Sequence, residues 1–118
     1  MNNVYHVDKM FYYHLRNKEG RPLITVCVVR KGDDFARGVS VCSLLDMPVK
    51  KVGRRIARDR ALKALFNKED DLSAITLNAF SVLGQIEDDY SFIEDDEYKS
   101  KYMPHLTAFE KELFGRNE

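Results

Sequence analysis

The apolar segment Leu23–Val29 constrains the fold of this chain more than any other feature of its sequence. It is rich in β-branched residues, and Thr25 is its only polar residue. Nearly continuous apolar segments of this kind are typical of strands that are buried on both faces of a sheet. We therefore expect a central strand at this position.

Two neighbouring segments are expected to pair with this strand. Met10–Arg16 is rich in aromatic residues, and residues 17–22 hold the Asn, Gly and Pro that favour a turn. After a predicted loop at Lys31–Ala36, the segment Arg37–Ser43 alternates apolar and small polar residues with a period of two. The three strands should form an antiparallel meander.

Pairing of Val28 near Val39 or Val41 would divide the side chains of the second hairpin between two faces. One face would carry four valines, Val26, Val28, Val39 and Val41. The other would carry Thr25, Cys27, Ser40 and Cys42. We expect the valine face to hold the helix that follows.

That helix is predicted over residues 48–66, with Asp46 as its cap and Pro48 in its first turn. Spacings of three and four residues place its apolar residues on one stripe: Val52, Ile56, Ala57, Ala61, Ala64 and Leu65. The basic residues lie mostly off that stripe.

The C-terminal part gives weaker patterns. Residues 72–83 suit either a helix or a fourth strand, and 85–101 suit a loop. Thr107–Glu110 forms a capping box before an apolar pair and Gly115, which predicts a short terminal helix. The expected class is α+β, with a three- or four-stranded antiparallel sheet, one long basic helix and C-terminal helical segments.

The length and composition fit one domain, residues 1–118, in which an acidic part (67–118) packs on the meander and helix of 10–66. We find no apolar run of membrane-spanning length and no signal-peptide pattern, so we expect a cytoplasmic protein without a membrane partner. The two cysteines, Cys27 and Cys42, suit buried thiols or a cross-strand disulfide; their spacing does not suit zinc.

The charges divide unevenly along a chain whose formal net charge is zero. Residues 1–66 hold fourteen Lys or Arg against six Asp or Glu, whereas 67–118 hold five against thirteen. Either the two parts screen each other, or one of them meets a polyelectrolyte.

Catalytic motifs are absent: the sequence holds no nucleophile elbow, no phosphate-binding loop of the Walker type and no zinc-protease motif. We therefore expect a non-enzymatic protein without cofactor or metal. The positive signal is a set of cations in the hairpin and the helix, where helix amides and positive charge together favour phosphate. The candidate nucleic-acid-binding residues are Arg30, Lys31, Arg37, Lys50, Lys51, Arg54, Arg55 and Arg58. The alternative is that these side chains only solvate the outer face of the helix.

Two resemblances bear on this surface. Three strands, then a helix that opens Lys-Lys-x-x-Arg-Arg with alanines at 57, 61 and 64, resemble the second half of a double-stranded-RNA-binding domain over Met10–Leu65. That resemblance implies phosphate contacts by Lys50, Lys51 and Arg54, read largely by shape. The chain departs from the family at Gly53, where an alanine is usual.

The second resemblance is to uncharacterised small proteins of bacteriophages and mobile elements. It is carried by Arg37–Ser43 together with Lys51-x-Gly53-Arg54-x-Ile56-Ala57-x-x-Arg60-Ala61. It implies a counter-defence setting, such as anti-CRISPR inhibition, with a host nucleoprotein or defence complex as the partner.

The acidic part offers an alternative function. Its carboxylates could imitate DNA phosphates, or the acidic segment and its aromatics could dock on a host enzyme, although a solvated loop is the ordinary interpretation. The candidate protein-binding residues are Glu87, Asp88, Asp89, Tyr90, Phe92, Glu94, Asp95 and Asp96.

Overall fold

The computed structural model describes residues 6–41, 50–70 and 100–115. Within these ranges the chain forms an open antiparallel sheet of four strands, in the order β1-β2-β3-β4, together with two helices. The predicted α+β class is therefore confirmed. The elements are β1 (Lys9–Arg16), β2 (Pro22–Lys31), β3 (Asp34–Val41), α1 (Lys50–Asn67), β4 (Lys101–Tyr102) and α4 (Ala108–Gly115).

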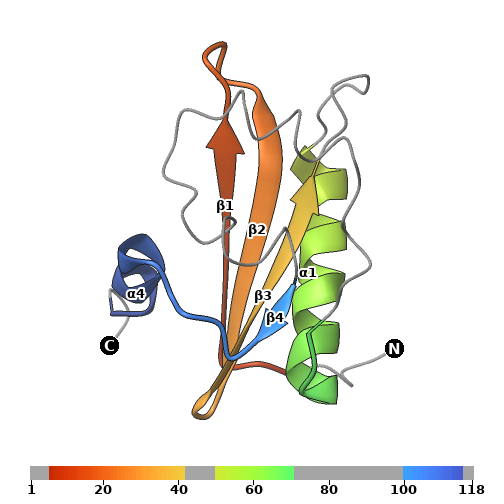
Figure 1. Cartoon of the computed structure of the whole chain (residues 1–118), viewed down its shortest axis with the longest axis vertical. Coiled ribbons are helices and arrows are strands. Elements are labelled where there is room, and N and C mark those ends of the chain that lie inside the picture. The colour runs from red at the N-terminus through yellow and green to blue at the C-terminus, as the bar shows by residue number, and fades with distance from the viewer. Residues whose placement is uncertain (1–5, 42–49, 71–99, 116–118) are drawn as a thin grey trace.

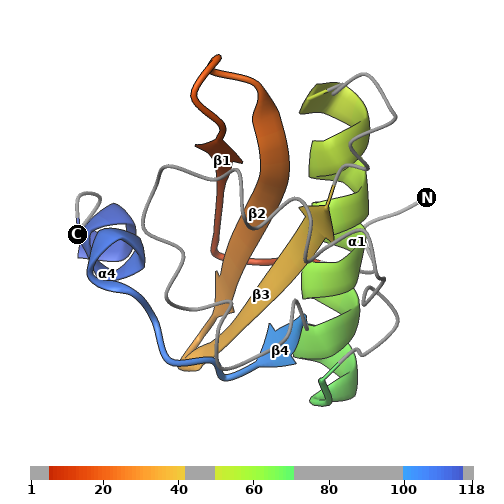
Figure 2. The same ribbon diagram turned by 45° about the horizontal axis from the view of Figure 1, so that its top comes forward.

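The sheet forms the middle of three layers, with α1 on one side and α4 on the other (Figures 1 and 2). Helix α1 packs mainly on β3 and β2, whereas Phe114 of α4 joins the core of the opposite face. Every residue of Leu23–Val29 is buried. This two-sided burial confirms the prediction that the segment is a central strand.

The strand register explains how the side chains divide between the faces. Val26 pairs with Val39 and Ile24 pairs with Val41, so the four valines share one face as predicted. Val28 itself pairs with Arg37. The expected loop at Lys31–Ala36 is too long, because β3 already begins at Asp34 and only a two-residue turn separates it from β2. Gly32 in that turn has a φ of 62°, which glycine adopts without strain.

The prediction that the long helix packs on the valine face of the sheet is wrong. Helix α1 lies on the face of Cys27 and Gly38, not on the valine face. A Cβ atom at Gly38 would stand 2.0 Å from the carbonyl oxygen of Ala57 and 2.4 Å from the amide nitrogen of Ala61. The backbones of β3 and α1 therefore approach each other as only small residues permit, while Phe114 packs into the valine face.

The apolar stripe of α1 differs in three residues from the predicted one, since Ile56 is only partly buried and Val52 and Leu62 also differ. Its buried residues are Ala57, Ala61, Leu62, Ala64 and Leu65. Leu62 was not expected among them, and Val52, which was, is 42% exposed. The predicted helix limits of 48–66 compare with an observed range of Lys50–Asn67. The expected cap Asp46 and Pro48 lie outside the described residues.

Of the two C-terminal elements, the sequence predicted α4 but not β4. The predicted capping box is confirmed: the amide of Glu110 donates to Thr107 Oγ1 at 3.1 Å, and the amide of Thr107 donates to Glu110 Oε1 at 2.9 Å. The fourth strand pairs Lys101 and Tyr102 with β3, so Lys101 was wrongly assigned to a loop. Residues 72–83, the other candidate for a fourth strand, lie outside the described ranges. None of the helices in those ranges is long and apolar enough to cross a bilayer.

Candidate functional site

The outer side of α1 carries a cluster of cations. Lys50, Lys51, Arg54 and Arg55 are exposed, and the Arg58 side chain is 42% exposed. Spacings of three and four residues place them along one side of the helix. Because the alanines of α1 face the sheet, the sheet-facing side is committed to packing and the cations are left at the surface.

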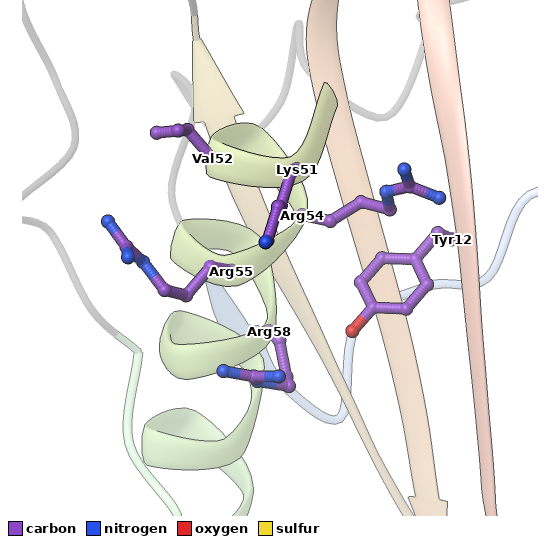
Figure 3. A pocket seen from close by; sticks show the side chains of 6 residues that line it. All are labelled: Tyr12, Lys51, Val52, Arg54, Arg55 and Arg58. Atoms are coloured by element: carbon purple, nitrogen blue, oxygen red, sulfur yellow. The ribbon is translucent and has the colours of Figure 1, made fainter. Parts of the chain in front are cut away.

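These cations border a groove of about 610 Å³ beside the helix. Its lining residues are Tyr12, Lys51, Val52, Arg54, Arg55 and Arg58. Figure 3 shows Arg54 extending from α1 toward Tyr12 on β1, whereas Arg55 points away from β1. We call this feature the basic groove.

The strand register explains why Tyr12 lies in the basic groove. Tyr12 pairs with Cys27, and Cys27 pairs with Gly38, so the three residues form one row across the sheet on the α1 side. Helix α1 stands over Gly38 at the other end of that row. Neighbouring strands lie about 4.8 Å apart, which places Tyr12 beside the helix and not beneath it.

The two aromatic side chains next to the cations are both held in their neutral forms. Burial raises the pKa of the Tyr12 hydroxyl above its usual value, opposed by the nearby guanidinium groups of Arg58 and Arg54. Burial also lowers the pKa of His14, and the positive charges of Arg16, Lys50 and Arg54 lower it further. His14 Nε2 is buried and has no hydrogen-bond partner among the described residues.

The hairpin cations do not join this cluster. Lys31 Nζ lies 5.0 Å from the centre of the Phe66 ring, near the C-terminal end of α1. Phe66 is sixteen residues beyond Lys50, which corresponds to about 24 Å along a helix. Arg30 precedes Lys31 at the same end of β2. The hairpin and the helix start therefore lie at opposite ends of α1, and their cations are not gathered in one place.

Arg37 does not lie on the candidate surface, because its side chain is buried. Its side chain is 1% exposed and forms an ion pair with Glu110 of α4. A guanidinium in that position cannot reach a phosphate in solution. Of the eight predicted cations, the structure brings five together along α1: Lys50, Lys51, Arg54, Arg55 and Arg58.

The sequence patterns did not identify Tyr12 and His14 as site residues. The available signal was the alternation of β1, which places Met10, Tyr12 and His14 on one face and Phe11, Tyr13 and Leu15 on the other. What the alternation cannot show is which of the two faces lies beside α1.

The described residues show no other chemical centre. They contain no group of three or more His, Cys, Asp or Glu side chains able to hold a metal ion. Cys27 is a buried free thiol, and burial raises its pKa to about 12. Its cross-strand partner is Gly38, so no disulfide joins β2 to β3 at this pair. Cys42 and the acidic candidates at 87–96 lie outside the described ranges.

No family model, curated protein or solved structure matches this chain. Its function therefore has to be inferred from the basic groove itself.

Proposed function

We propose that this protein binds nucleic acid without catalysis, through phosphate contacts made by the basic groove. The observation that carries the proposal is the lining of the groove, where Lys51, Arg54, Arg55 and Arg58 meet on one surface. Lys and Arg supply the donors and the positive charge that phosphate oxygens prefer.

The position of these cations on the helix supports a binding role over a purely solvating one. The first turn of α1 contains Lys50 and Lys51 and no acidic residue. Cations are unfavourable near a helix N-terminus, because the helix dipole is positive there, and like charges three or four residues apart also repel. An anionic ligand would relieve both effects. Among the described residues, Arg58 Nε forms an exposed ion pair with Asp59 Oδ1 at 3.5 Å, and a surface pair of this kind contributes little to stability.

The proposed partner is nucleic acid or a host nucleoprotein complex, in the setting of a phage or mobile element. The phage or mobile-element setting rests on the resemblance carried by Arg37–Ser43 and Lys51–Ala61, whereas the resemblance of Met10–Leu65 supports nucleic acid as the partner. The alternative, inhibition of a host or defence complex through residues 87–97, falls outside the described residues, and none of the described contacts favours it.

The test is fluorescence anisotropy of labelled duplex RNA, duplex DNA and single-stranded DNA at two salt concentrations. We expect micromolar or tighter binding that weakens with salt, since each phosphate contact contributes about 0.7 to 0.9 to the slope of log affinity against log salt. Binding that is absent even at low salt would refute the proposal.

Charge reversal locates the surface. The double variant Lys51→Glu with Arg54→Glu should abolish binding. A matched control, Lys63→Glu with Lys68→Glu, changes the net charge equally at exposed positions outside the groove and should retain most of it. Equal losses in both would show that net charge, and not the groove, determines affinity. The variant Asp95→Lys with Asp96→Lys should spare nucleic-acid binding and impair only the protein-binding alternative.

A further inference from the structure

The side of β1 that faces α1 forms an open shelf next to the basic groove. Strand β1 is at the edge of the sheet, and α1 packs mainly on β3 and β2. The shelf therefore consists of Met10, Tyr12 and His14, each only partly buried. Tyr12 lines the groove together with the cations (Figure 3). The Tyr12 ring packs in part against the buried cluster under α1, and it also gives the groove an aromatic surface that phosphate binding alone does not need.

We infer that the basic groove binds single-stranded nucleic acid, with a base stacked on the Tyr12 ring and the neighbouring phosphates held by Lys51, Arg54 and Arg58. This inference rests on the proposed function and narrows it to one class of ligand. A positively charged groove combined with an aromatic side chain is the arrangement by which proteins bind single strands without reading sequence.

The geometry favours a single strand because only there are the bases free to leave their neighbours. In a duplex the bases stack on one another and are not free to stack on a protein side chain. A protein that recognises a duplex by its shape contacts mainly phosphates and sugars, so an aromatic ring among its cations would make no base contact. Here the ring comes from β1 and the cations come from α1, so the ligand would lie between the two elements. Lys51 and Arg58 are seven residues apart on α1, or about 10 Å along its axis, which suits a short length of backbone.

The state of the Tyr12 side chain is compatible with this role. Its hydroxyl donates to Met10 Sδ at 3.4 Å, which restrains the ring on the shelf. Because burial raises the pKa of that hydroxyl, the side chain is a neutral phenol at physiological pH and does not repel phosphate. The lowered pKa of His14 keeps the next side chain of the shelf uncharged as well.

The experiment separates bases from phosphates. Affinity is measured for a labelled oligothymidylate and for an abasic oligomer of the same length, which carries the same backbone charge. The wild-type protein should bind the base-containing strand about 5-fold or more tightly than the abasic strand, which is the lower end of what one stacked base contributes. Tyr12→Leu should abolish that preference, so that the variant binds the two strands with equal affinity. Tyr12→Phe should retain the preference, because the ring remains.

The outcomes distinguish this inference from the proposed function. Equal binding of both strands by the wild-type protein would overturn base stacking and leave phosphate binding intact, and so would tighter binding of a duplex than of the single strand. Failure to bind either strand or any duplex would overturn both. If Tyr12→Leu does not fold, photocrosslinking of a 4-thiothymidine strand to the wild-type protein decides the question. Crosslinks at Tyr12 support the inference, and crosslinks confined to other residues overturn it.

Discussion

Arg37 on β3 and Glu110 on α4, 73 residues apart in the chain, form a bidentate ion pair in the interior. Arg37 Nε donates to Glu110 Oε2 at 2.9 Å and Nη2 donates to Oε1 at 2.5 Å, with side-chain exposures of 1% and 0%. Nη2 also donates to the carbonyl oxygen of His105, and the Tyr13 hydroxyl donates to Glu110 Oε2. The pair therefore fastens α4 to the valine face of the sheet.

Glu110→Gln should destabilise the protein by about 3–5 kcal/mol, because it leaves the buried Arg37 guanidinium without a counter-charge. Gln can still complete the capping box with Thr107, so the loss reports the missing charge and not the missing cap. Urea unfolding followed by circular dichroism measures the change. Combining Glu110→Gln with Arg37→Met should recover a large part of the loss, since the double variant has no buried charge.

The exposed Glu112 on the same helix supplies the control for this prediction. Glu112→Gln should change the free energy of unfolding by less than about 1 kcal/mol, as expected for a surface charge. Equal effects of the two substitutions would contradict a structural role for the buried pair.

Gly38→Ala should destabilise the protein by about 3 kcal/mol or more, at the upper end of the cost of overpacking. The added Cβ would stand 2.0 Å from the carbonyl oxygen of Ala57, and a backbone atom inside a helix cannot move aside as a side chain can. Thermal and urea unfolding measure the effect. Gly115→Ala is the matched control, because nothing lies within 4 Å of a Cβ there. If both substitutions were equally mild, α1 would not be fixed by its close approach to β3.

Features set by neighbouring residues were predictable from the sequence, and features set by distant contacts were not. The burial of Leu23–Val29, the α1 helix and the Thr107–Glu110 capping box each follow from patterns within a few residues. The face on which α1 packs depends on how closely the backbones of β3 and α1 approach at Gly38, and no hydrophobic pattern encodes that distance. A valine face is the more apolar one, but it is also too bulky for that approach.

The candidate site shows the same division. The cations of α1 were found because helical spacing places them off the buried stripe. Arg37 was misplaced because its partner, Glu110, is 73 residues away, and Tyr12 was missed because its position depends on the register of three strands. Gly53, where double-stranded-RNA-binding domains usually have alanine, is likewise explained by a distant contact, because a Cβ there would lie 2.6 Å from Oγ1 of Thr25 on β2.

The stability of the protein should fall as the pH is lowered through 6.5, and His14 should account for part of that loss. Burial and the charges of Arg16, Lys50 and Arg54 lower the pKa of His14 in the folded state below the model-peptide value of 6.5. Between the lowered pKa and 6.5 the unfolded chain binds more protons than the folded one, so stability rises with pH across that window and levels off below it. Urea unfolding of the wild-type protein and of His14→Gln at several pH values between 7.5 and 5 measures the difference. A pH dependence that is identical in the two proteins would contradict this role for His14.

Arg54→Gln should separate binding from stability, lowering the affinity for nucleic acid while slightly raising the stability of the fold. Arg54 lies three or four residues from Lys50, Lys51 and Arg58 on α1, and each such like-charge pair costs about 0.2–0.5 kcal/mol. Removing its charge should therefore stabilise the helix by roughly 0.6–1.5 kcal/mol at low salt, and the gain should vanish at high salt as the repulsion is screened.

Lys63→Gln is the control for this last prediction, since Lys63 lies four residues after Asp59 and three after Arg60, so that its attractive and repulsive pairs nearly cancel. Thermal unfolding at two salt concentrations, together with the anisotropy titration, gives both readouts. If Arg54 serves ligand binding at a cost in stability, Arg54→Gln should raise the melting temperature and lower the affinity for nucleic acid. If Arg54→Gln left the affinity for nucleic acid unchanged, the cations of α1 would only solvate the surface of the helix. The proposal that the basic groove binds nucleic acid would then be wrong.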